Sequence, residues 1–270
     1  MYKLVALDMD GTLLNSQKEI SVRTKQAIND AREQGAHVVL ASGRPLEGMA
    51  DYLAQLGMTS NDDYVLSYNA SLVQRVGNKE VIRKQIMKGS DAKNIASLSH
   101  DLGVFVHAFS PTRGLITPQN NTFTQHESTI NGVEVTEIDF SELDNDEEII
   151  KVMMVADSEI LSAAIAQLPE SLYEQYTIVQ SAPFFLELLN PKSNKGAGVA
   201  MLAEHLNINP SEVICMGDAG NDHHMIEYAG LGVAMGNATE DTKALANHIT
   251  DTNDNDGVAK VIEEFILMRS

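Results

Sequence analysis

The 270-residue chain has one cysteine, few basic side chains and no long apolar run, and each shortage excludes a class of protein. Cys215 alone cannot form an intramolecular disulfide, which is typical of proteins from a reducing compartment. The 19 Lys and Arg residues are outnumbered by 38 Asp and Glu residues, which gives a formal net charge of −19. Binding to nucleic acid or anionic lipid depends on clustered Lys and Arg, so we expect neither as a partner.

The sequence also lacks a segment for secretion or membrane insertion. No apolar run approaches the roughly 20 residues that a helix needs to cross a bilayer. The first residues are apolar, but Asp8 and Asp10 interrupt them before a signal-peptide core could form. We therefore expect a cytoplasmic protein, and its 43% hydrophobic and 21% charged residues are typical of a globular fold.

Short apolar runs alternate with helical patterns at both ends of the chain. Buried strands are expected at 4–7, 37–41, 64–66, 213–216 and 232–235, and helices at 21–35, 45–57, 195–206 and 222–228. In the first of these helices Ser21 is the expected N-cap and Gly35 the stop. Alternation of strand and helix predicts an α/β fold with a parallel sheet that is covered on both faces.

Residues 83–190 show a different pattern, in which paired strands lie between helices. Helices are expected at 91–102 and 158–168, and strands at 104–109, 115–117 and 149–155, with a hairpin formed by 176–179 and 184–189. This pattern predicts an α+β module inserted into the parallel-sheet core. The predicted core is then 1–82 with 191–270, and the predicted insertion is 83–190.

Polar side chains follow directly after the predicted strands of the core. In chain order they are Asp8 with Asp10, Ser42-Gly43-Arg44, Asn69, and Asp218 with Asp222. Because the carboxyl ends of parallel strands share one edge of a sheet, these residues are expected to meet in one crevice. Carboxylates so close together raise one another's pKa unless a cation lies among them. A cluster of oxygen ligands without histidine or cysteine favours Mg²⁺ over zinc.

A cluster of acids accepts a phosphate dianion only if it also holds positive charge. Lys195 starts the helix that opens the second part of the core, and it is the expected cation. The Ser42 hydroxyl and the Gly43 amide can donate hydrogen bonds to phosphate oxygens. Arg44 either touches the substrate or pairs with an acid of the core. A single Asp after a strand usually caps a turn and a single Lys usually lies on the surface, but their convergence here favours a binding site.

These segments resemble the motifs of the haloacid dehalogenase-like (HAD) hydrolases. The matching stretches are Asp8-Met9-Asp10-Gly11-Thr12, Ser42-Gly43-Arg44-Pro45, Lys195, and Gly217-Asp218-Ala219-Gly220-Asn221-Asp222. Within the family, the chain is most similar to the Cof-type subgroup and to its YidA-like sugar phosphatases. The resemblance implies a HAD-like fold, with a Rossmann-like parallel-sheet core and an inserted α+β cap domain of the C2 type that determines substrate specificity.

The resemblance also implies a Mg²⁺-dependent phosphatase that acts on small phosphorylated metabolites such as sugar phosphates. Asp8 would attack phosphorus and become an aspartyl-phosphate, while Asp10 would serve as general acid and then as general base. Lys195 would offset charge on Asp8 and on the phosphoryl group. The implied phosphate ligands are Ser42, Gly43, Arg44, Lys195 and Asn221. The implied Mg²⁺ ligands are Asp8, the backbone carbonyl of Asp10, Asp218, and Asp222 either directly or through water.

Other readings of the same residues stay open. The substrate could instead be flavin mononucleotide or pyridoxal phosphate, the enzyme could be a phosphomutase, or the chain could be a regulator that binds phosphorylated metabolites without turnover. The sequence does not indicate the oligomeric state, the cap residues that contact the leaving group, or the role of His223 and His224.

Overall fold

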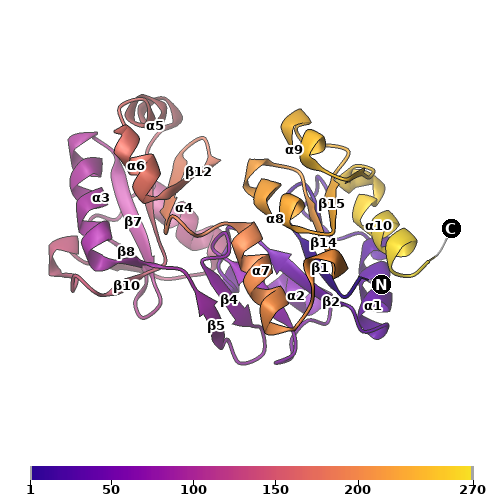
Figure 1. The fold of residues 1–270 in the computed structure, drawn as a ribbon. Coiled ribbons are helices and arrows are strands. Elements are labelled where there is room, and N and C mark those ends of the chain that lie inside the picture. Colours follow the sequence, from indigo (N-terminus) through magenta and orange to yellow (C-terminus); the bar gives the residue numbers. More distant parts are fainter. Residues whose placement is uncertain (1, 269–270) are drawn as a thin grey trace. The chain divides into compact units, whose positions relative to one another are not determined.

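The computed structural model describes residues 2–268, and the chain divides into two compact units (Figure 1). One unit, the core, contains the chain up to Lys84 and again from Asn194 onward, and the other, the inserted unit, is Gln85–Ser193. Among the described residues, no helix combines the length and the apolar character needed to cross a bilayer.

The core unit is built on one eight-stranded sheet with the order β16-β15-β14-β1-β2-β3-β4-β5. The strands are β1 (Leu4–Leu7), β2 (His37–Ala41), β3 (Tyr64–Ser67), β4 (Leu72–Arg75), β5 (Val81–Lys84), β14 (Val213–Gly217), β15 (Leu231–Ala234) and β16 (His248–Ile249). Neighbours from β16 to β3 are parallel, whereas β4 and β5 pair antiparallel at one edge. The predicted α/β fold with a parallel-sheet core is therefore confirmed.

Helices cover both faces of this sheet, because alternate residues of each central strand point to opposite sides. Val5 and Leu7 of β1 pack in an apolar cluster with α1 and α10, while Leu4 and Ala6 pack in a second cluster with α7 and α8. The helices of this unit are α1 (Val22–Glu33), α2 (Ala50–Gln55), α7 (Lys195–His205), α8 (His223–Tyr228), α9 (Glu240–Leu245) and α10 (Gly257–Phe265). Four 3-10 turns accompany them: η1 (Glu47–Met49), η3 (Pro210–Glu212), η4 (Gly220–Asp222) and η5 (Asn253–Asn255).

Local signals place α1 where the sequence predicts it, but the prediction for α2 is wrong at its start. Ser21 caps α1 by accepting a hydrogen bond from the Thr24 amide at 3.1 Å. The predicted helix from Pro45 instead begins with η1 and continues as α2 from Ala50. The segment before it is bonded through its backbone to the turn after β3, by Ser42 N to Leu66 O, Asn69 N to Ser42 O and Tyr68 N to Arg44 O.

The inserted unit contains a six-stranded sheet with the order β12-β13-β11-β7-β8-β9. Its strands are β7 (Phe105–Ser110), β8 (Gly114–Thr117), β9 (Val135–Glu137), β11 (Lys151–Val155), β12 (Thr177–Ala182) and β13 (Phe185–Leu189). The predicted hairpin is present as β12 and β13. The single strand predicted at 149–155 is wrong, because β10 (Glu148–Ile149) pairs with β6 (Met87–Lys88) and β11 pairs with β7 and β13. Ile150 lies between them and donates its amide to Phe109 O at 2.7 Å.

The two faces of the inserted sheet differ in polarity. One face packs against an apolar cluster with α3 (Gly89–Asp101) and α5 (Ser158–Ile165), and the short α6 (Glu170–Gln175) and η2 (Phe140–Glu142) add residues to it. The other face carries buried polar side chains below α4 (Thr122–Asn131). There Lys151 Nζ lies 3.3 Å from Glu187 Oε1 and 3.6 Å from Glu127 Oε1. The two carboxylates offset the free-energy cost of removing the lysine charge from water.

His107 lies in the same polar layer, and its burial predicts how stability responds to acid. Its Nδ1 is 3.0 Å from Thr124 Oγ1, and burial together with the charge of Lys151 lowers the pKa of the imidazole from 6.5 to about 3. The folded chain thus keeps His107 neutral where the unfolded chain would be protonated. Stability from this group is complete above pH 6.5 and is lost as the pH falls toward 3, at about 1.4 kcal/mol per pH unit.

We expect His107→Gln to remove this part of the pH dependence. Glutamine can still form a hydrogen bond with Thr124, but it does not titrate. The contributions of all other groups that titrate in acid are the same in the two proteins and cancel in the comparison. Between pH 6 and pH 4.5 the wild type should lose about 2 kcal/mol more unfolding free energy than the variant. Urea unfolding at both pH values measures this, and parallel losses in the two proteins would contradict it.

Candidate active site

Three carboxylates meet at the carboxyl edge of the core sheet. Asp8 follows β1 and Asp218 follows β14, and these two strands are neighbours. The Asp8 amide extends the pairing by donating to Met216 O at 3.0 Å. Ligand oxygens of Asp8, Asp218 and Asp222 all lie within 4.8 Å of one another. The structure therefore brings together three of the four residues that the sequence predicts as metal ligands.

Lys195 lies among these acids as a fully buried cation. It is the first residue of α7, and the N-cap Asn194 fixes the start of that helix by accepting the Ala197 amide at 2.8 Å. Lys195 Nζ donates to Asp8 Oδ1 and, at 2.7 Å, to Asp222 Oδ1. The predicted convergence of this lysine with the acids is thus present in the structure.

Asp222 organises the loop that carries Asp218. Its Oδ2 accepts the amides of Asp218 and Ala219 at 2.9 and 3.1 Å, and its Oδ1 accepts from Lys195. A side chain at Gly217 would overlap with that of Asp222, so the close approach requires glycine. Both oxygens of Asp222 therefore already hold hydrogen bonds from the protein.

The charges of the cluster do not balance without a further cation. Burial raises the pKa of Asp8 to about 8, an effect that Lys195 opposes and that Asp222 and Asp218 reinforce. For Lys195, burial alone would lower the pKa, but Asp222 and Asp8 outweigh it and raise the pKa. Three carboxylates thus face one ammonium group. Because all the donor atoms are hard oxygens, these residues fit a divalent cation such as Mg²⁺.

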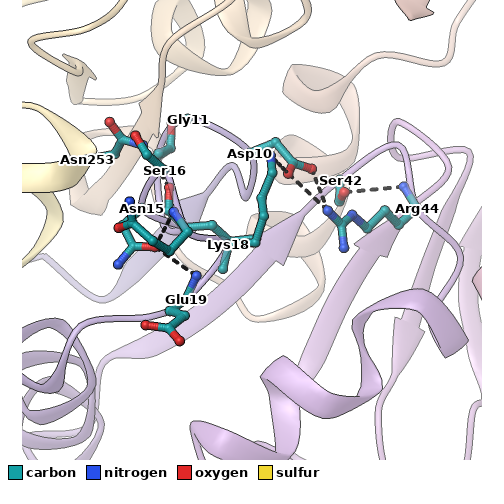
Figure 2. Close-up of polar contacts among 12 residues, drawn as sticks. Asp10, Gly11, Asn15, Ser16, Lys18, Glu19, Ser42, Arg44 and Asn253 are labelled. Atoms are coloured by element: carbon teal, nitrogen blue, oxygen red, sulfur yellow. Dashed lines mark hydrogen bonds and ion pairs between the residues drawn. The ribbon is translucent and has the colours of Figure 1, made fainter. Parts of the chain in front are cut away.

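The carboxylate of Asp10 pairs with two cations (Figure 2). Arg44 Nη2 lies 2.9 Å from both Asp10 oxygens, and Lys18 Nζ lies 2.8 Å from Oδ1. Burial would raise the pKa of Asp10, but the two cations outweigh it and lower that pKa. Asp10 would therefore bind a metal ion through its backbone carbonyl, since its side chain is already paired. Of the two alternatives for Arg44, the structure shows the pairing with an acid of the core.

Sequence reasoning missed Lys18. It stands eight positions after Asp10 in a loop, where no motif spacing marks it. The only available signal is its place in the same polar segment that follows β1, and a lysine in a loop is usually a solvated side chain.

The predicted phosphate-binding residues Ser42, Gly43 and Asn221 are linked through Asn69. Asn221 Nδ2 lies 3.5 Å from Asn69 Oδ1, and a Cβ at Gly43 would lie 3.3 Å from Asn69 Nδ2. Ser42 is buried, and its Oγ accepts the Arg44 amide at 3.2 Å. These residues come from the ends of β2, β3 and β14, so the predicted meeting of chain-distant segments is observed.

His223 has a structural contact, since its Nε2 lies 2.9 Å from Thr242 Oγ1. Cys215 is fully buried in β14, and burial raises the pKa of its thiol, so it carries no reactive thiolate.

Comparison of the sequence with known proteins identifies one family. Haloacid dehalogenase-like hydrolases match residues 5–262 of the chain. The chain is 40% identical over 271 residues to the Bacillus subtilis (strain 168) protein named "Putative phosphatase YxeH", and each chain is covered completely. It is 32% identical to the 5-amino-6-(5-phospho-D-ribitylamino)uracil phosphatase YcsE of the same organism, over 98% of this chain and 96% of that one.

Solved structures give the same result. A haloacid dehalogenase-like hydrolase from Bacteroides thetaiotaomicron superposes with a TM-score of 0.85 at 33% identity, over 98% of this chain and 99% of that chain. The HAD subclass IIB sugar phosphatase BT4131 superposes with a TM-score of 0.79 at 26% identity, over 97% and 98% of the two chains. The family match, the full-length relatives and the acid–lysine cluster agree, and the chain belongs to the haloacid dehalogenase-like hydrolases.

Proposed function

We propose that this chain is a Mg²⁺-dependent phosphatase that hydrolyses phosphate monoesters of small metabolites, above all sugar phosphates, through an aspartyl-phosphate on Asp8. As a member of its family the chain is a phosphoric monoester hydrolase. The finer proposal rests on one observation, the buried Lys195 that joins Asp8 to Asp222 beside Asp218. That arrangement offers a carboxylate nucleophile next to fixed positive charge, which is what phosphoryl transfer needs.

In the first proposed step, a carboxylate oxygen of Asp8 attacks phosphorus, and the bond from phosphorus to the ester oxygen breaks. Lys195 contacts Asp8 Oδ1, and Oδ2 is the proposed attacking oxygen. Lys195 holds the carboxylate in place and offsets negative charge as the phosphoryl group approaches. Asp10 is proposed to give a proton to the leaving alcohol oxygen. Because Lys18 and Arg44 lower its pKa, this role requires the bound phosphate dianion to favour the protonated form.

In the second proposed step, water attacks the phosphorus of the aspartyl-phosphate and gives a proton to the Asp10 carboxylate. The bond between phosphorus and the Asp8 oxygen breaks, so that inorganic phosphate leaves and both carboxylates return to their starting forms. Ser42, Gly43 and Asn221 are proposed to donate hydrogen bonds to the phosphate oxygens in both steps. Arg44 is proposed to add positive charge there.

Asp8, Asp218 and the Asp10 backbone carbonyl are the proposed Mg²⁺ ligands, and Asp222 supports them. Its oxygens are occupied by Lys195 and by two amides, which favours an indirect role, through Asp218 or through water. Bound Mg²⁺ would supply charge neutralisation for the phosphoryl group and would favour the ionised form of Asp8. We propose in addition that the inserted unit selects the leaving group.

The metal part of the proposal predicts that EDTA abolishes turnover and that excess Mg²⁺ restores it. Without a divalent cation, burial and the neighbouring acids favour protonated Asp8. The measurement is p-nitrophenyl phosphate hydrolysis by the full chain before chelation, after chelation and after Mg²⁺ is returned. EDTA-treated protein that keeps its full rate would exclude a metal requirement.

A substrate panel tests the class of leaving group. Sugar phosphates are favoured because one structural neighbour is a sugar phosphatase and one relative acts on a phosphorylated ribityl chain. Flavin mononucleotide and pyridoxal phosphate belong in the panel. Hexose phosphates should give the highest kcat/KM and release inorganic phosphate. Isomerised sugar phosphate as the product would instead identify a phosphomutase, and binding without any product would identify a regulator.

A further inference from the structure

The turn that connects β3 to β4 has an unusual backbone conformation. Three consecutive residues that are not glycine, Tyr68, Asn69 and Ala70, have φ +53°, +53° and +64°. This left-handed region is costly for residues with a Cβ, although asparagine adopts it more readily than most. Such a conformation persists only where the surrounding structure holds it in place. The contacts of the turn therefore show what it is held against.

Two backbone hydrogen bonds attach the turn to the segment that follows β2. The Asn69 amide donates to Ser42 O at 2.8 Å, and the Tyr68 amide donates to Arg44 O at 3.1 Å. In the sequence, the two acceptors stand on either side of Gly43, whose amide is a proposed phosphate ligand. The turn and the backbone of Gly43 are therefore fixed relative to each other.

The turn also packs on α7, the helix that begins with Lys195. A side chain at Gly198 would overlap with the Cβ of Ala70, so the helix backbone approaches the turn as closely as glycine permits. All three residues of the turn are buried. The turn is thus held between the segment after β2 and the start of α7, and both of these carry proposed site residues.

The side chain of Asn69 reaches a third element, the loop after β14. Its Oδ1 accepts from Asn221 Nδ2 at 3.5 Å, while its Nδ2 lies 3.3 Å from the position of a Cβ at Gly43. In the sheet order, β1 and β2 separate β3 from β14, so this side chain links elements that do not pair with each other. Asn69 therefore lies between two proposed phosphate ligands, the Gly43 amide and the Asn221 side chain.

We infer that Asn69 is a positioning residue, which holds the Gly43 amide and the Asn221 side chain at the spacing that lets both contact one phosphoryl group. The inference rests on the proposed function of Gly43 and Asn221 as phosphate ligands. Hydrogen-bond donors that are fixed before the reaction stabilise the transferring group without reorganisation. The buried left-handed turn fixes Asn69 itself, so its amide can act as a rigid spacer.

The first test is Asn69→Gly, which removes the side chain and still permits the left-handed backbone. We expect kcat/KM to fall about 30-fold with p-nitrophenyl phosphate and equally with a hexose phosphate, because both substrates carry the same phosphoryl group. The inhibition constant of inorganic phosphate should rise about 10-fold for the same reason. A loss confined to one of the two substrates, or no loss with either, would overturn the inference.

Asn207→Gly is the matched control. Asn207 lies just after α7 in the same unit, has φ +56° and is exposed, so the control makes the same substitution at a left-handed position outside the site. It should leave both kcat/KM values and the phosphate inhibition constant unchanged. Losses in this control like those of Asn69→Gly would attribute them to the backbone change and overturn the inference.

The double variant of Asn69→Gly with Asn221→Ala separates positioning from a general loss of structure. Two independent losses of about 30-fold would multiply to about 10³-fold, whereas a shared role should keep the double variant within about 100-fold of the wild type. Multiplied losses would overturn the inference. If Asn221→Ala loses activity and Asn69→Gly does not, only the role of Asn69 fails. If Asn221→Ala loses none, the phosphate-binding proposal for Asn221 fails as well.

Asn69→Asp keeps the test decisive if the glycine variant does not fold. Aspartate has nearly the same shape and keeps the acceptor for Asn221, but it places a negative charge close to Gly43. Repulsion between like charges should raise the inhibition constant of inorganic phosphate at least as far as expected for Asn69→Gly. Thermal unfolding with saturating Mg²⁺ shows that the variant is folded. A folded Asn69→Asp protein with the wild-type inhibition constant would overturn the inference.

Discussion

Asp8→Asn should abolish phosphatase activity, with kcat reduced by about 10⁴-fold or more. An amide has the same shape as the carboxylate but is not a nucleophile at phosphorus, so no aspartyl-phosphate forms. The change also replaces an acceptor that is bonded to Lys195 with a neutral one, and a carbonyl oxygen can still accept that hydrogen bond. The variant is therefore expected to fold, and the loss reflects chemistry.

Two measurements check this result. Steady-state hydrolysis of p-nitrophenyl phosphate and of a hexose phosphate gives the loss in kcat, and acid quenching during turnover should trap phosphorylated protein only in the wild type. Asp62→Asn makes the same change at an exposed position of the core unit and should keep the wild-type rate. Residual activity of Asp8→Asn above about one part in 10³ would place the nucleophile elsewhere.

The place of Asp8, Asp218 and Lys195 could be predicted because a parallel sheet fixes it. Residues that directly follow neighbouring strands must meet at the carboxyl edge, whatever their separation in the sequence. Asp8 and Asp218 follow β1 and β14, which are paired, and Lys195 starts a helix that packs on the same sheet. The pattern of apolar residues, which marks the strands, is therefore sufficient to predict that these three residues lie close together.

The orientation of Asp10 could not be predicted in this way. It depends on a loop held by Asp254 and Asn253, more than 230 positions away, and on the left-handed conformation of Lys18. Patterns of apolar residues contain no information on such contacts. The late start of α2 coincides with backbone bonds to the turn after β3, which no local propensity indicates.

Lys195→Met should reduce kcat by about 10³-fold. Methionine has a similar length and suits a buried position, but it leaves Asp8 and Asp222 without their shared cation. The unpaired acids should also lower the unfolding free energy by about 3–5 kcal/mol in the absence of a divalent cation. Removal of a positive charge beside the acids should at the same time increase the affinity for Mg²⁺, because the cation meets less repulsion.

The expected changes in kcat, in unfolding free energy and in Mg²⁺ affinity report on different roles of Lys195. Lys151→Met is the control for the loss of a buried positive charge that has no proposed part in catalysis. Lys151 is equally buried and also lies between two carboxylates, those of Glu127 and Glu187 in the inserted unit. Urea unfolding with and without Mg²⁺ should show a similar loss of stability in both variants, which Mg²⁺ reverses only in Lys195→Met. Under conditions where both proteins are folded, only Lys195→Met should lose turnover. If Lys195 and Mg²⁺ neutralise the same carboxylates, each weakens the binding of the other. A Lys195→Met protein that binds Mg²⁺ more weakly than the wild type would therefore contradict a site shared by the two cations.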